Sequence, residues 1–270
     1  MSVIVPRPAA TVTLLRDAPG GFEVLMMQRN HQSAFMPGMH VFPGGAVDKS
    51  DSTEDYCSLC AGMDDATASR ILGIGQGGLA YWIAAVRESF EEAGILFACD
   101  DTGALVTLDE TDRAARFHDY RRRVEHGEHP FSTMLKEEGL CLPLEQMVYF
   151  SHWITPAGAP RRYDTRFFVA VAPESQQPLH DNRETINHVW IKPAAALDGS
   201  RKGTFEMRTP TVHTLGMFAQ HDSISSLMKA MAERGNIPVI EPRIAKDGRR
   251  LMPGEPGYEA AGTTEGRGSW

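Results

Sequence analysis

The sequence lacks the features that mark membrane, secreted and nucleic-acid-binding proteins. It has no apolar run near the roughly 20 residues that a membrane-spanning helix needs, and its first eight residues, MSVIVPRP, lack the charged and apolar regions of a secretory signal. Basic residues are also fewer than acidic ones: the chain has 27 Lys and Arg and 35 Asp and Glu, which gives a net charge of −8. This balance argues against bulk nucleic-acid binding and a polybasic membrane contact.

Cysteine is scarce as well. Four cysteines in 270 residues are too few for a disulfide scaffold, so a reducing cytoplasmic location is expected. Cys57 and Cys60 form a lone C-x-x-C pair. One pair does not fill a tetrahedral zinc site, and we interpret both as ordinary buried thiols.

The stretch at 81–96, YWIAAVRESFEEAGIL, carries the strongest functional signal. Glu88, Glu91 and Glu92 are spaced i, i+3 and i+4, so a helix would place them on one edge. Apolar residues recur with the same period on another edge, and Gly94 is a fitting helix stop. Like charges at this spacing repel one another, and a bound divalent cation would relieve that repulsion. Mg²⁺ binds through carboxylate oxygens and leaves room for substrate phosphates. The alternative interpretation is a solvated acidic face.

The segment RESFEEAGI at 87–95 resembles the second half of the Nudix box, G-x5-E-x7-R-E-U-x-E-E-x-G-U, where U is apolar. Ser89 stands at the first apolar position. Gly45 resembles the opening glycine, but it lies 42 positions before Arg87 where the uninterrupted pattern has 14, which leaves an insertion of 28 residues. Asp51 stands where the pattern has glutamate.

Two further segments resemble peroxisomal coenzyme A diphosphatases with such an insertion: RNHQSAFMPGMHVFPGG at 29–45 and WITPAGAPRRYDTRFF at 153–168. Two positions depart from the coenzyme A signature of Nudix enzymes, which has arginine where Ala34 stands and Ser or Ala where Asn30 stands. The chain ends in GSW rather than in the peroxisomal signal Ser-Lys-Leu.

The resemblance implies an α+β Nudix fold, a mixed β-sheet sandwiched between helices, with helical insertions. We expect a single domain over 1–241, with the insertion at about 49–78 inside the box and a helical addition at about 109–139. Residues 242–270 are rich in Pro, Gly and charge and are expected to form a mostly flexible tail.

Local patterns predict a strand hairpin over 10–29 and a helix at about 64–72. Further extended segments are expected at 39–47, 147–155, 165–171 and 188–191, and a helical stretch at 211–234. Arginines and acids mix along 109–139 and predict a solvated face that includes Arg113, Arg116, Arg121, Arg122 and Arg123.

The resemblance also implies the roles of the box residues. Glu88, Glu91 and Glu92 would bind Mg²⁺ or Mn²⁺, with the Gly45 carbonyl as a fourth ligand. Two residues would give structural support, Arg87 by orienting a helix carboxylate and Gly94 by ending the helix.

The catalytic and substrate-binding groups leave alternatives open. The catalytic set is Glu88, Glu91 and Glu184, with the proton acceptor open between Glu88 and Glu184. His152 is a further base candidate, although a hydrogen-bonded core histidine is the commoner outcome. Substrate phosphates need hydrogen-bond donors, and arginine side chains suit them. We expect Arg29 to contact the ligand together with at least one of Arg161, Arg162 and Arg166. An aromatic side chain, Tyr163 or Phe35, could stack on a base.

The favoured function is metal-dependent hydrolysis of a nucleoside diphosphate linked to another moiety. Coenzyme A or an acyl-coenzyme A is the favoured substrate, giving 3′,5′-ADP and 4′-phosphopantetheine. One alternative is an ADP-ribose or NADH pyrophosphatase, and another is a non-catalytic nucleotide-sensing module. The partner is a small molecule, with no nucleic acid and no membrane expected, and a homodimer remains open by analogy with the fold.

Overall fold

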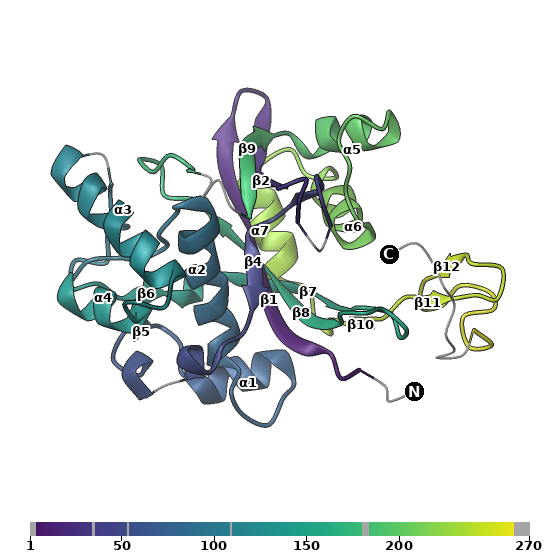
Figure 1. Ribbon diagram of the computed structural model, residues 1–270, viewed down its shortest axis with the longest axis horizontal. Helices are drawn as coiled ribbons and strands as arrows, with labels where there is room; N and C mark the ends of the chain where they lie inside the picture. The colour runs from purple at the N-terminus through teal and green to yellow at the C-terminus, as the bar shows by residue number, and fades with distance from the viewer. Residues whose placement is uncertain (1–3, 34–35, 53, 109, 180–183, 262–270) are drawn as a thin grey trace.

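The computed structural model describes residues 4–33, 36–52, 54–108, 110–179 and 184–261. In this part of the chain a mixed sheet of eight strands lies between two groups of helices (Figure 1). The strands of this sheet are β1 (Arg7–Ala18), β2 (Gly21–Arg29), β3 (His40–Val41), β4 (Gly44–Ala46), β7 (Val148–Ile154), β8 (Tyr163–Val171), β9 (Thr185–Ile191) and β10 (Val239–Ile240). The helices are α1 (Asp65–Leu72), α2 (Leu79–Ala93), α3 (Thr111–Glu125), α4 (Phe131–Glu137), α5 (Pro193–Arg201), α6 (Thr209–Phe218) and α7 (Ile224–Ala232).

Strand β1 is the centre of the sheet. It pairs in parallel with β8 and antiparallel with β2 and β4. The order β10-β7-β8-β1-β2-β3 is completed by β9, which pairs with β2. The hairpin predicted over 10–29 is therefore β1–β2, and the extended segment predicted at 39–47 is divided into β3 and β4.

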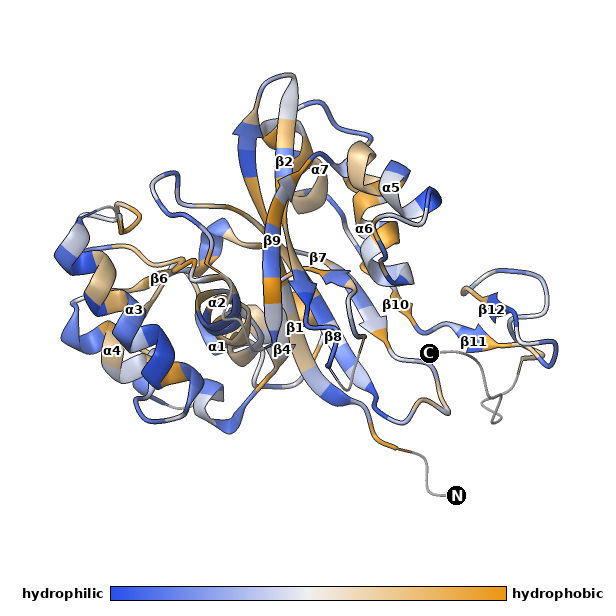
Figure 2. Cartoon of the chain, turned by 45° about the horizontal axis from the view of Figure 1, so that its top comes forward, coloured by the Kyte–Doolittle hydropathy of each residue, from blue (hydrophilic) through white to orange (hydrophobic). Residues whose placement is uncertain are grey.

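Alternation along β1 and β2 sends apolar side chains to both faces of the sheet, which makes two cores. On one face Val12 and Leu14 pack with α2, and on the other Leu15 and Val24 pack with α6 and α7. In Figure 2 the outer helix α3 is mostly hydrophilic, whereas the strands at the centre carry hydrophobic residues. The sheet is buried on both sides, so a ligand must enter where the helices leave it uncovered.

The box insertion forms a small helical unit. Two 3₁₀ turns, Lys49–Ser52 and Glu54–Tyr56, precede the short strand β5 (Cys60–Ala61) and the predicted helix, α1. Helix α1 begins after Asp64, whose side chain accepts from Thr67 N, and ends at Gly73 in the left-handed region with φ of 68°. Strand β5 pairs with β6 (Leu142–Pro143) and so joins the insertion to the α3–α4 region.

Four expectations need correction. The helical stretches predicted at about 109–139 and 211–234 are each two helices, α3–α4 and α6–α7, because Gly127 and the 219–223 turn interrupt them. Residues 243–261, expected to be a flexible tail, pair as β11 (Arg243–Ile244) and β12 (Arg250–Leu251), and Tyr258 donates to Glu241 O at 2.8 Å. The last nine residues lie outside the described part.

The fourth correction concerns the thiols predicted to be buried, since Cys57 is exposed and Cys60 is half-buried. A second pair, Cys99 and Cys141, faces across an isolated bridge with a 3.1 Å Sγ–Sγ separation, and all four cysteines are free. None of the described helices has the length and apolar character needed to cross a membrane.

Candidate active site

Helix α2 carries the acidic edge of the site. It ends at Gly94, where φ is 68° and the backbone N–H donates to the Phe90 carbonyl. Ser89, the polar residue at an apolar position of the motif, is buried and donates to Ile95 O at 3.0 Å. Its hydroxyl therefore helps to end the helix.

Arg121 holds the same end of α2. Its guanidinium donates to Glu91 O at 2.8 Å and to Glu92 O at 2.9 Å, which are carbonyls of the last helical turn. The mixed charge of 109–139 predicted a solvated side chain. Instead Arg121 is buried, because α3 packs across the C-terminus of α2.

Arg87 is the hub of a buried ion-pair network. It donates to Asp51 through Nε at 2.8 Å and Nη2 at 3.0 Å, and its Nη1 donates to Glu88 at 2.9 Å and to Glu91 at 3.2 Å. Burial alone would lower the pKa of Arg87, but the Asp51 hydrogen bonds and the nearby carboxylates outweigh it and raise this pKa. These contacts orient the helix carboxylates, and Arg87 does not line the cavity.

The opening glycines meet the helix across the insertion. Gly44 N donates to Glu92 Oε2 at 3.1 Å. A Cβ on Gly45 would lie 2.5 Å from the Glu88 carboxylate, so a side chain there would require that carboxylate to move. Arg87 Nη2 also donates to Ala46 O at 3.0 Å. The two halves of the divided motif are therefore in direct contact.

The three helix glutamates carry raised pKa values. Burial raises the pKa of Glu88 to about 7, with Arg87 opposing and Glu91 adding to the shift. Burial also raises the pKa of Glu91, and that of Glu92 is raised by burial and then by the charge of Glu88. The cost of keeping these carboxylates ionised together is what a bound cation would offset.

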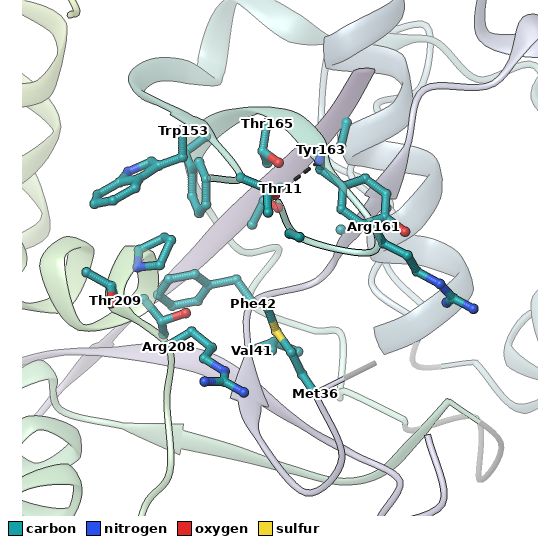
Figure 3. Close-up of a pocket in the computed structure, with 18 of the residues that line it drawn as sticks. Thr11, Met36, Val41, Phe42, Trp153, Arg161, Tyr163, Thr165, Arg208 and Thr209 are labelled. Carbon is teal, nitrogen blue, oxygen red and sulfur yellow. Dashed lines mark hydrogen bonds between the residues drawn. The ribbon is translucent and has the colours of Figure 1, made fainter. Parts of the chain in front are cut away.

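A cavity of about 640 Å³ opens beside these glutamates (Figure 3). Glu88, Glu92 and Gly45 line one part of it, whereas Glu91 is turned toward Arg87. The remaining wall includes the aromatic side chains Phe42, Trp153 and Tyr163 and the charged side chains Arg29, Arg161, Glu184, Arg208 and Arg250.

Arg29 and Glu184 lie together in this cavity. Arg29 Nη2 donates to Ser33 Oγ at 3.1 Å and lies 3.7 Å from Glu184 Oε2. The Glu184 backbone is fixed because its carbonyl accepts from Asn30 N at 2.8 Å, while its side chain is 64% exposed. The carboxylate of Glu184 and the guanidinium of Arg29, which can donate hydrogen bonds to phosphate oxygens, thus lie beside the helix glutamates.

Of the three arginines predicted near the 153–168 turn, only Arg161 lines this cavity. Arg162 is buried and donates to Thr155 O at 3.0 Å, Ile4 O at 2.8 Å and Glu241 at 2.6 Å, so its role is structural.

Arg166 is also misplaced by the sequence prediction. Its buried side chain contacts Asp164 and His152 and lies 5.5 Å from the Tyr81 ring, and Arg166 and His152 line a second cavity across the sheet. The reason is alternation along β8: Tyr163, Thr165 and Phe167 point to the glutamate cavity, and Arg166 points away. His152, the further base candidate, accordingly lies outside the site.

Arg208 and Arg250 were not predicted. Arg208 immediately precedes α6, and Arg250 lies in the segment interpreted as a tail. A basic residue before a Thr-Pro helix start was the available signal for Arg208, whereas local sequence gave none for Arg250. Ala34 and Phe35, at which substrate preference and base stacking were expected, lie outside the described residues.

Comparison with known proteins decides the family. The model described as the NUDT19 Nudix domain matches residues 3–76 and 74–217. The chain belongs to the NUDT19 Nudix domain family. It is 29% identical to the acyl-coenzyme A diphosphatase NUDT19 of Gallus gallus, over 84% of this chain and 72% of that protein. It is 27% identical to the Homo sapiens protein of the same name, over 93% and 76%.

A solved structure supports the same family. The Nudix hydrolase from Alicyclobacillus acidocaldarius matches with a TM-score of 0.70 at 26% identity, over 86% of this chain and 99% of that chain. The predicted Nudix fold and hydrolase class are therefore confirmed.

Nudix hydrolases generally use divalent metal ions, and the box residues fit one in their chemistry. Glu88, Glu91 and Glu92 are hard oxygen donors, and the missing side chain of Gly45 leaves its backbone against Glu88. In the described residues these carboxylates do not yet converge as a ligand group of three, because Glu91 faces Arg87 and Glu92 accepts from Gly44.

Proposed function

We propose that this Nudix hydrolase cleaves the diphosphate bond of coenzyme A or an acyl-coenzyme A, giving 3′,5′-ADP and a 4′-phosphopantetheine product. The observation that carries the proposal is one cavity in which the acidic edge of α2 meets arginines and aromatic side chains. The names of the relatives from chicken and human support the substrate class.

The proposed metal is Mg²⁺ or Mn²⁺, held by Glu88, Glu91 and Glu92 with the Gly45 carbonyl. When bound, it would polarise a phosphoryl oxygen and lower the pKa of a water molecule. In the reaction the water oxygen forms a bond to one phosphorus, and the bridging P–O bond breaks with its electron pair passing to the leaving phosphate.

The side chains of the chain supply the remaining chemistry. Arg29 reduces the negative charge that shields the diphosphate, and Arg161 lies at the same cavity for a second contact. The water proton goes to a carboxylate, either Glu184 beside Arg29 or Glu88 on the helix. Trp153 and Tyr163 offer apolar faces for the nucleoside or the pantetheine arm.

The test is product analysis by mass. The protein is incubated with coenzyme A, acyl-coenzyme A, NADH, ADP-ribose and capped RNA, with and without Mg²⁺ or Mn²⁺. We expect metal-dependent release of 3′,5′-ADP from the first two substrates. Glu91→Gln and Glu92→Gln should each abolish it, whereas Glu233→Gln, at a 67% exposed side chain just after α7, should not.

The outcomes separate the alternatives. Turnover of ADP-ribose or NADH without turnover of coenzyme A would replace the proposed substrate but keep the hydrolase. Tight nucleotide binding with no turnover on the panel would indicate a sensing module. Wild-type turnover in either glutamate variant would contradict the assignment of the helix carboxylates.

A further inference from the structure

Cys99 and Cys141 face each other outside the active-site cavity. Each backbone N–H donates to the carbonyl of the other residue, at 2.8 Å and 3.0 Å, so the two form a hydrogen-bonded antiparallel bridge. Residues in such a pair have Cα atoms about 5.5 Å apart, which lies within the range of roughly 4.4–6.8 Å that disulfides span. The backbone therefore already provides the spacing that a disulfide needs.

The two thiols are also in contact. Their Sγ atoms are 3.1 Å apart, about 1 Å longer than an S–S bond. Cys99 is only 3% exposed, whereas Cys141 is half-buried. Burial and the hydrogen bond with Cys141 raise the pKa of Cys99 to about 12, which keeps that thiol protonated. A small oxidant therefore reaches Cys141 first and finds Cys99 beside it.

The other two cysteines come close to this pair without completing a metal site. Cys57 is exposed and Cys60 is half-buried on β5. Burial raises the pKa of Cys60 to about 12, and the nearby Cys57 and Cys141 thiols add to the shift. In the part of the chain that the structure describes, no three His, Cys, Asp or Glu side chains converge as metal ligands. The contact between Cys99 and Cys141 thus supports a disulfide rather than a thiolate metal centre.

A bond between these thiols would close a loop around α3 and α4. The two positions are 42 apart, and both helices lie between them, on the α2 side of the sheet (Figure 1). Cys99 follows the end of α2 at Gly94, and Cys141 precedes β6, which pairs with β5 of the insertion. Helix α3 carries Arg121, which holds the last turn of α2 through two carbonyls. The loop would therefore enclose the helical unit that supports the catalytic helix.

We propose that Cys99 and Cys141 are a peroxide-responsive thiol pair, whose disulfide stabilises the α3–α4 unit against the end of α2. Hydrogen peroxide oxidises the Cys141 thiol to a sulfenic acid and is itself reduced, releasing one water. The Cys99 sulfur then attacks the Cys141 sulfur, and the hydroxyl group leaves with the Cys99 proton as a second water. A thiol reductant reverses the bond, so a reducing compartment keeps the pair open.

Peptide mapping tests whether the bond forms. Trypsin places Cys99 in peptide 88–113, Cys141 in peptide 137–161, and both Cys57 and Cys60 in peptide 50–70. After treatment with a small excess of hydrogen peroxide, we expect a non-reduced digest to contain 88–113 joined to 137–161, lighter by two hydrogen atoms than the two peptides together. Dithiothreitol should separate them again.

Thermal unfolding tests what the bond does. A cross-link across 42 positions restricts the unfolded chain, so we expect peroxide to raise the melting temperature by about 5–10 °C, reversibly with dithiothreitol. Cys141→Ser and Cys99→Ser should each remove this shift. The matched control is Cys57→Ser, at an exposed thiol, which should keep it.

The contrary results are distinct, and neither readout uses a substrate, so they do not depend on the proposed function. A disulfide to peptide 50–70 in place of the expected one, or oxidation of Cys141 to a sulfinic acid without cross-linking, would overturn the pair. Zinc released from the purified protein when its thiols are blocked would assign a metal centre and overturn it as well. An unchanged melting temperature in fully cross-linked protein would overturn the stabilising role.

Discussion

Asp51 and Arg87 form a buried, two-pronged ion pair, with Nε–Oδ1 at 2.8 Å and Nη2–Oδ2 at 3.0 Å. Asp51 comes from the first turn of the insertion, whereas Arg87 lies in the middle of α2. The shorter Asp51 side chain, which stands where the motif has glutamate, thus reaches the same arginine that orients Glu88 and Glu91. The pair ties the insertion to the catalytic helix.

Removing Asp51 should weaken both the fold and the site. Asp51→Ala leaves a buried guanidinium short of two hydrogen bonds, and breaking a buried pair from one side costs roughly 3–5 kcal/mol. We expect the lower end of this range, because Glu88 and Glu91 remain, together with a loss of turnover. Urea unfolding measures the change. Asp55→Asn is the control, because its pair with Lys136 is about half exposed and is worth at most about 1 kcal/mol.

A methyl group at Gly45 should inactivate the enzyme. In Gly45→Ala the added Cβ would lie 2.5 Å from the Glu88 carboxylate, so the carboxylate or β4 must move. We expect kcat to fall by at least about 100-fold, as small displacements of catalytic groups do, while circular dichroism stays unchanged. Gly75→Ala, an exposed position with no atom within 4 Å of the new Cβ, should retain full activity. Equal kcat in the two variants would contradict the close contact of the motif halves.

Arg161 and Arg162 are neighbours with opposite expected behaviour. Arg161→Met should raise KM by about tenfold through loss of one charged contact, with an unchanged melting temperature. Arg162→Met removes donors to two carbonyls and to Glu241, and should lower stability by about 3 kcal/mol. Thermal unfolding and steady-state kinetics on both variants check the pair. A KM effect in Arg162→Met at a temperature where it is fully folded would count against its structural role.

His40 should make stability depend on pH. It stacks on Phe205 with ring centroids 3.6 Å apart, and burial lowers its pKa, with the Glu206 backbone and charge opposing in part. A histidine with a lowered folded pKa is protonated first in the unfolded state, so its stabilising effect is present above about pH 6.5 and is lost as the pH falls below that.

The measurement is urea unfolding between pH 8 and pH 5. His40→Phe should lose less stability over this range than the wild type, because the aromatic stack remains and the titrating group is gone. His118→Gln, at an exposed position on α3, should follow the wild type. A His40→Phe curve parallel to that of the wild type would show that burial of His40 does not govern this pH dependence.

Much of the fold could be predicted because its signals are local. Alternation of apolar and polar residues predicted the β1–β2 hairpin, and the period of α2 placed its glutamates on one edge. Asp64 and Gly73 mark the two ends of α1. The orientation of β8 could not be predicted in this way. Alternation separates Arg166 from Phe167 but does not tell which side of the sheet is open, since that depends on where the helices pack.

The other residues that were wrongly placed or not predicted owe their positions to tertiary contacts. Arg121 has the composition of a solvated residue, yet it caps α2 because α3 crosses that helix end. Arg250 reaches the cavity through its contact with Thr209, 41 positions earlier in the chain. Contacts made at this separation leave no periodicity in the sequence.

The divided motif also has a consequence for how the enzyme folds. Gly45 and Arg87 are 42 positions apart, where an undivided motif has 14, and closing the longer loop costs roughly 1 kcal/mol more in chain entropy. Helix α2 can form from its own sequence, but Glu92 meets Gly44 only after the insertion has closed. Catalytic competence thus belongs to no local segment: a fragment that stops before α2, or one that starts after Gly45, carries half a site.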